Sequence, residues 1–147
     1  MRSQTLSCLV FASLCAVAAP ACTVTTTTAP PPVRPAEARA SRNGFEFLGQ
    51  RAVNGSADHD VIPVGRRDGR FHELMIVVER APVEIYDMVV TFGNGERWEP
   101  RTRLVFGRDT TSRSIDLPGG ARVVQRVDFR YGNLVAGTQA KVELWGR

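Results

Sequence analysis

The chain has 147 residues, of which 43% are hydrophobic and 23% are charged, and it carries a formal net charge of +4. This length and composition leave room for one hydrophobic core, which excludes both a multidomain protein and a wholly disordered one. Lys141 is the only lysine, and acids such as Glu73 and Asp128 are interleaved with the arginines. Nucleic-acid binding needs clustered basic residues, so the charge pattern does not favour a nucleic-acid partner.

Residues 1–21 are predicted to be a secretory signal peptide. Met1 and Arg2 give a positive start, residues 6–19 are mostly apolar, and Ala19-Pro20-Ala21 is a small-residue cleavage site. The apolar stretch is too short for a helix that spans a membrane. We therefore expect export to the periplasm or to the surface of the bacterial envelope.

Cys22 would be the first residue of the mature chain. Cys8 and Cys15 lie inside the predicted signal, so the mature domain has no disulfide to stabilise it. A lone cysteine at this position resembles the lipid-modified cysteine of bacterial lipoproteins, although Ala19 stands where that motif prefers a large aliphatic residue. We expect a lipid anchor to the membrane at Cys22; the alternative is ordinary cleavage that leaves a free thiol.

Residues 22–43 are predicted to be a linker rich in threonine and proline. The segment contains four consecutive threonines at 25–28 and three prolines at 30–32, with few large apolar side chains. Such a composition cannot bury enough surface to fold. In the polyproline conformation it would reach about 60 Å, at roughly 3 Å per residue.

Residues 44–147 are predicted to form an all-β domain of about eight strands. Short apolar alternations, separated by glycine, proline, asparagine and aspartate, predict strands at 45–48, 61–64, 72–80, 83–92, 101–106, 114–117, 123–131 and 140–145. No stretch keeps a helical period over three turns. The pattern favours an antiparallel two-sheet β-sandwich, jelly-roll-like in topology, with a closed barrel as the alternative.

Three details of this domain can be predicted from parity and turn chemistry. In strand 83–92 the apolar positions change parity, which predicts a bulge near Tyr86-Asp87. In strand 123–131, Val123, Val127, Phe129 and Tyr131 should face the core, and the second face of strand 72–80 should be partly covered. Asn94-Gly95 predicts a tight primed turn between 89–92 and 96–99, and Pro118-Gly119 predicts a type II turn.

Four separated blocks carry a resemblance to a known family. They are Asp60-Val61-Ile62-Pro63-Val64-Gly65, Val83-Glu84-Ile85-Tyr86-Asp87 with the following Asn94-Gly95, Arg113-Ser114-Ile115-Asp116-Leu117-Pro118-Gly119-Gly120, and Val142-Glu143-Leu144-Trp145-Gly146. From about Phe45 to Arg147 the chain resembles a family of small exported bacterial proteins of unknown function. The resemblance implies an exported β-rich domain and brings no activity, ligand or catalytic residue with it.

Asp58, His59 and Asp60 are the densest group of candidate metal ligands, and His72 is the other histidine. Carboxylates and imidazoles can bind calcium or zinc if a loop brings them together. However, Val61-Ile62-Pro63 interrupts the calcium-loop pattern, so a solvated loop is the better interpretation. Convergence of His59, Asp60 and His72 would favour a metal-dependent enzyme, which is one alternative function.

The candidate ligand-binding residues are Trp98 and the arginines Arg66, Arg67 and Arg70. Arginines in one turn can bind a phosphate or carboxylate through paired donors. An aromatic ring such as Trp98, expected near solvent, could stack on a sugar, as β-sandwiches often allow. Arg101 and Arg103 are expected instead to pair with Glu96 or Glu99 at a sheet edge.

These patterns predict a module that is not an enzyme, needs no cofactor and acts by binding or structural association in the envelope. No nucleophile elbow or phosphate-cradling loop is present in the sequence. An envelope glycan or protein is the expected partner. The second alternative is a soluble glycan- or polyanion-binding protein.

Overall fold

The computed structural model describes residues 40–41, 43–54, 57–101 and 103–147. All of them belong to the second of the two units into which contacts divide the chain, Pro32–Arg147. The predicted signal peptide, Cys22 and nearly all of the predicted linker lie outside the described residues, so those predictions stay predictions.

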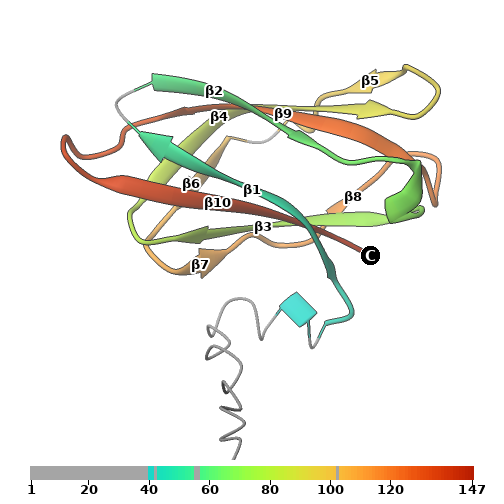
Figure 1. Ribbon diagram of the computed structural model, residues 1–147, viewed down its shortest axis with the longest axis horizontal. Helices are drawn as coiled ribbons and strands as arrows, with labels where there is room; N and C mark the ends of the chain where they lie inside the picture. The colour runs from blue at the N-terminus through green and yellow to red at the C-terminus, as the bar shows by residue number, and fades with distance from the viewer. Residues whose placement is uncertain (1–39, 42, 55–56, 102) are drawn as a thin grey trace, which may run out of the picture. The chain divides into compact units, whose positions relative to one another are not determined.

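Two antiparallel β-sheets stack face to face (Figure 1). The described residues form ten strands and one 3₁₀ turn: β1 (Glu46–Asn54), β2 (Ala57–Pro63), η1 (Arg66–Asp68), β3 (Glu73–Glu79), β4 (Val83–Phe92), β5 (Arg97–Trp98), β6 (Leu104–Phe106), β7 (Thr110–Thr111), β8 (Ile115–Asp116), β9 (Val124–Gly132) and β10 (Gln139–Gly146). The first sheet has the order β1-β10-β3, with β7 and β8 both on β3; the second has the order β2-β9-β4, with β5 and β6 both on β4. The sandwich prediction is confirmed, and the alternation of the chain between the sheets is that of a jelly roll.

The core fills the space between the sheets, where alternate residues of each strand point inward. On β9, Val127, Phe129 and Tyr131 are at most 1% exposed, as predicted. The predicted bulge in β4 is present, because its register with β9 shifts between Ile85 and Asp87. A second shift near Thr91 makes Val124 the buried residue instead of the predicted Val123.

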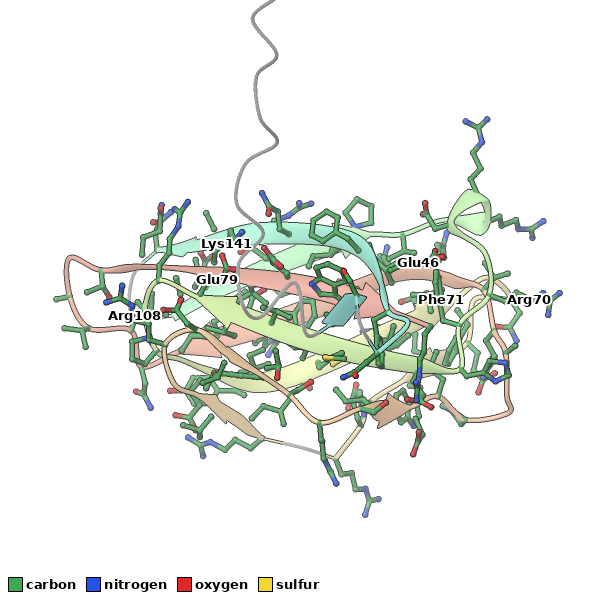
Figure 2. The ribbon with its side chains drawn as sticks, turned by 90° about the horizontal axis from the view of Figure 1, so that it is seen from below. Glu46, Arg70, Phe71, Glu79, Arg108 and Lys141 are labelled. Atoms are coloured by element: carbon green, nitrogen blue, oxygen red, sulfur yellow. The ribbon has the colours of Figure 1, made fainter. Side chains whose placement is uncertain are left out.

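The outer face of the first sheet is covered as well, as the sequence predicted for residues 72–80. Met75, Val77 and Trp145 form a second apolar cluster with Ala40 and Phe45. Beside this cluster the only lysine is buried among acids: Lys141 Nζ lies 2.9 Å from Glu79 Oε2 and also contacts Glu143 (Figure 2). Trp145 Nε1 donates a hydrogen bond to the Glu143 carboxylate.

The strand boundaries differ from the prediction at several places. β2 begins at Ala57, so Asp58, His59 and Asp60 lie in a strand and the predicted solvated loop was wrong. β1 is nine residues long, because it pairs with β10 as far as Asn54. Gly49 lets it approach β2: a Cβ at Gly49 would lie 2.7 Å from Ile62 Cγ2. The predicted strand 101–106 begins only at Leu104, and β7 was not predicted. Arg103, just before β6, pairs with Glu84 on β4, so its expected pairing with Glu96 or Glu99 was wrong.

Candidate functional site

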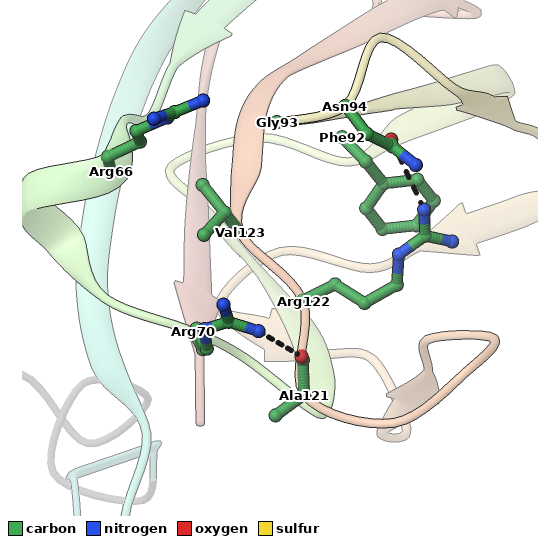
Figure 3. Close-up of a pocket in the computed structure, with 8 residues that line it drawn as sticks. All are labelled: Arg66, Arg70, Phe92, Gly93, Asn94, Ala121, Arg122 and Val123. Carbon is green, nitrogen blue, oxygen red and sulfur yellow. Dashed lines mark hydrogen bonds between the residues drawn. The ribbon is translucent and has the colours of Figure 1, made fainter.

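One end of the sandwich carries a pocket of about 470 Å³ (Figure 3). Three segments form it: the η1 turn and the residues before β3, the β4–β5 turn, and the residues before β9. The lining residues are Arg66, Arg70, Phe92, Gly93, Asn94, Ala121, Arg122 and Val123. Three of these are arginines, and the lining contains no carboxylate, so the pocket combines an apolar floor with a cationic rim.

Backbone hydrogen bonds hold the three segments together. Phe71 and Arg122 exchange two bonds of 2.9 Å, which places the neighbouring Arg70 next to the residues before β9. Gly93 N donates to Val123 O at 2.8 Å, which ties the β4–β5 turn to the same segment. The pocket is therefore built on fixed backbone, which suits a preorganised binding site.

The β4–β5 turn is not the primed turn that Asn94-Gly95 predicted. A primed turn of that type needs positive φ at both central residues, and only Gly95 has it, at 85°. Gly95 N donates to Phe92 O and Phe92 N donates to Glu96 O, so the loop has three residues and ends in a glycine bulge. The wider loop leaves Asn94 at the rim of the pocket.

Arg122 is the most tightly held of the three arginines. Its guanidinium lies over the Phe92 ring, 3.5 Å from the centroid, and its side chain is 17% exposed. Nη2 donates to Glu96 Oε2 at 2.5 Å and to Asn94 Oδ1 at 3.3 Å. The hydrogen bond from Arg122 is the main reason that the pKa of Glu96 lies below its usual value, followed by that from Asn94.

Arg66 and Arg70 are the less neutralised arginines. Arg70 Nη1 makes one long hydrogen bond, 3.4 Å, to Ala121 O. Within the described part of the chain, Arg66 has no ion-pair or hydrogen-bond partner for its side chain, and it points toward the pocket (Figure 3). Arg67, on the same turn, is exposed but does not line the pocket.

Trp98 does not join this pocket. It is half-buried and packs against the core, and it lines a separate hollow of about 250 Å³ with Arg101 and Arg113. Tyr86, an exposed aromatic, has the Arg103 guanidinium over its ring at 4.8 Å. These two rings therefore do not share one groove, and an occupied ring face leaves little room for stacking on a sugar.

The candidate metal ligands are separated. Asp58 and Asp60 lie on the face of β2 that points into the sandwich, whereas His59 points outward, with Nε2 3.9 Å from Asp128 Oδ1. His72 lies just before β3, where its backbone N bonds to Arg147 O. In the described ranges, no three His, Cys, Asp or Glu side chains gather to hold a metal ion, so His59, Asp60 and His72 do not converge.

The sequence as a whole matches a family model over residues 14–146, described as a domain of unknown function (DUF2541). The chain belongs to this family. The match begins well before Phe45, where the sequence analysis placed the start of the resemblance. Cys22 and the linker therefore lie within the matched range of the DUF2541 domain.

Other comparisons add little to the DUF2541 assignment. No curated protein matches the chain. A solved structure from the structural and functional characterization of Pseudomonas aeruginosa AlgX is similar at 8% identity, over 69% of this chain and 26% of that chain, with a TM-score of 0.43. The DUF2541 chain spans about a quarter of that protein, and so low a similarity carries no argument. Over the residues that the structure describes, no helix is long and apolar enough to cross a membrane.

Proposed function

We propose that this protein is an exported, envelope-anchored module that is not an enzyme and that binds an anionic group in the pocket formed by Arg66, Arg70 and Arg122. The observation that carries the proposal is the charge of this pocket: three guanidinium groups from two segments line it, only that of Arg122 is paired with an acid, and no acid is among the lining residues. Guanidinium groups bind carboxylate and phosphate through paired hydrogen bonds.

The pairing of arginines with acids on the rest of the second sheet favours a local binding site over an extended surface for a polyanion. On its outer face, Arg126 pairs with Asp128 at 3.2 Å, and a small hollow there mixes Arg97 and Arg130 with acids. Cations that are already paired offer little to a polyanion. The ligand we propose is therefore a compact one, with a single anionic group for the arginines and a body that packs on Val123.

The binding proposal can be tested by calorimetric titration with glucuronate, inorganic phosphate and neutral glucose. We expect the two anions to bind and glucose not to bind. Losing a hydrogen bond to a charged group costs about 1.5–3 kcal/mol, so Arg66→Gln and Arg70→Gln should each weaken binding by about tenfold or more. Arg67→Gln is the matched control, because Arg67 lies on the same turn outside the pocket, and it should leave affinity unchanged.

Either of two results would contradict the binding proposal. One is equal loss of affinity in Arg66→Gln and Arg67→Gln, which would indicate a diffuse surface charge effect. The other is binding of glucose as tightly as glucuronate, which would favour the alternative of a neutral glycan-binding module.

Export and anchoring are supported by the three-part pattern of residues 1–21 and by Cys22. Intact mass and membrane fractionation of the protein from a bacterial host, beside Cys22→Ser, test this part. We expect a mature chain that begins at a diacylated Cys22 and is lost from the membrane fraction in the variant. A soluble, unmodified chain in both would remove the anchor.

A further inference from the structure

At the other end of β9, two buried side-chain oxygens lack a hydrogen-bond partner within the described part of the chain. They are Asp60 Oδ2 and the hydroxyl of Tyr131, a residue that is 1% exposed. Unpaired buried polar atoms are uncommon in native proteins, and a bound ion or water is a frequent explanation. Both atoms belong to the inner face of the same strand pair, β2 and β9.

The register of β2 and β9 brings a second carboxylate to this place. Asp58 is directly opposite Tyr131, and Asp60 is opposite Phe129, one step further into the sandwich. Asp58 and Asp60 are two residues apart on one strand, so their side chains share a face, and Tyr131 is a direct or diagonal neighbour of both. Asp58 Oδ1 accepts a hydrogen bond from His59 N, which fixes the orientation of its carboxylate.

The surroundings disfavour negative charge on Asp60 and Tyr131. Burial first, and then the negative charge of Asp58, raise the pKa of Asp60 above its usual value. The pKa of Tyr131 is raised mainly by burial, and then by the same two carboxylates. Arg51 on β1 is the nearby cation that favours their ionised forms, and its guanidinium also donates to Gln50 O.

An open pocket borders this group at Asp58 and Tyr131. A pocket of about 480 Å³ is lined by Asp58, His59, Tyr86, Arg130 and Tyr131. Asp60 does not line this pocket, and its Oδ2 and the Tyr131 hydroxyl are buried, so an ion would have to reach them past Asp58.

We propose that Asp58, Asp60 and the Tyr131 hydroxyl form a binding site for a hard divalent cation of the calcium type. All three donors are oxygens, which hard cations prefer, and calcium accepts irregular geometry and completes its shell with water. Such an ion would give both unpaired oxygens a partner. The site is independent of the arginine pocket, which lies beyond the opposite end of β9.

Thermal melting of the mature protein, freed of metal with EDTA and then titrated with calcium chloride, tests the proposal. A site with few carboxylates should bind in the range of about 0.1–1 mM. At 10 mM calcium the folded-to-unfolded ratio should rise about tenfold or more, which raises Tm by several degrees. Terbium, which reports on nearby tyrosine by luminescence, should bind and be displaced by calcium.

The variants make the result specific. Asp60→Asn should abolish the calcium-dependent rise in Tm, and Tyr131→Phe should reduce both that rise and the terbium signal. Asp128→Asn, which removes a carboxylate from the outward face of the partner strand β9, should keep them. A Tm that does not respond to calcium in the wild type would overturn the site, and so would an equal rise in Asp60→Asn. In either case the two oxygens are satisfied by water or by a proton on Asp60.

Discussion

Replacing Lys141 with methionine removes the cation from a buried ion cluster. The side chains of Lys141, Glu79 and Glu143 are only 9%, 4% and 0% exposed. Methionine keeps the apolar length of lysine but deprives two buried carboxylates of the ammonium group between them. Breaking a buried pair in this way costs about 3–5 kcal/mol, a large part of the 5–15 kcal/mol of a typical domain. For a domain of about 100 residues the loss corresponds to a fall in Tm of about 12 °C or more.

Urea denaturation at pH 7 measures this loss as a change in the free energy of unfolding. A second substitution, Glu79→Gln in the Lys141→Met background, should recover part of it, because one buried charge is then removed. Arg108→Met is the matched control: its pair with Asp109 is 70% and 59% exposed, and such surface pairs contribute at most about 1 kcal/mol. A loss below about 1 kcal/mol in Lys141→Met would refute the account of this cluster.

Two further predictions concern packing and pH. A Cβ at Gly132 would lie 2.1 Å from Tyr86 Cε2, so Gly132→Ala should lower the free energy of unfolding by about 1–3 kcal/mol. The loss should disappear when Tyr86 is also replaced by alanine. An equal loss with and without the Tyr86 side chain would contradict the clash. The hydrogen bond from Ser114 is the main reason that the pKa of Glu73 lies below 4.5, and Arg147 lowers it further. The ionised Glu73 carboxylate therefore stabilises the folded protein above pH 4.5, and this stabilisation is lost as the pH falls through the lowered pKa. Ser114→Ala should therefore destabilise the protein at pH 7 but much less at pH 2 in urea denaturation, and a difference that is constant with pH would argue against this origin.

Much of the fold could be predicted because its strands obey simple parity. The apolar alternation along β9 and the parity break at Tyr86-Asp87 identify the core face and the bulge without reference to other segments. The errors lie where a distant contact decides. β1 extends beyond residue 48 because it pairs with β10, from the far end of the domain's sequence, and no local pattern encodes that pairing.

The candidate site was predictable only in part. Arg66 and Arg70 are close in sequence and could be found as a basic turn, but Arg122 comes from another loop and joins them through the Phe71–Arg122 backbone bridge. The sequence showed Asp58, His59 and Asp60 as one group of candidate ligands. Because they lie on a strand, their side chains alternate: His59 faces outward, while Asp58 and Asp60 face Tyr131. The contact between these loops and the pairing of β2 with β9 depend on the assembled sandwich. They could not be predicted from the spacing of residues along the sequence.

The most direct test of the central claim is an NMR titration of the ¹⁵N-labelled mature protein with glucuronate. We expect saturable shifts of the backbone amides that surround the arginine pocket, at residues 66–70, 93–95 and 121–123, with little change at Arg126 or Arg130 on the face of the second sheet. Absence of saturable shifts at the pocket, or equal shifts across both regions, would contradict the claim that this pocket is a specific site for an anion.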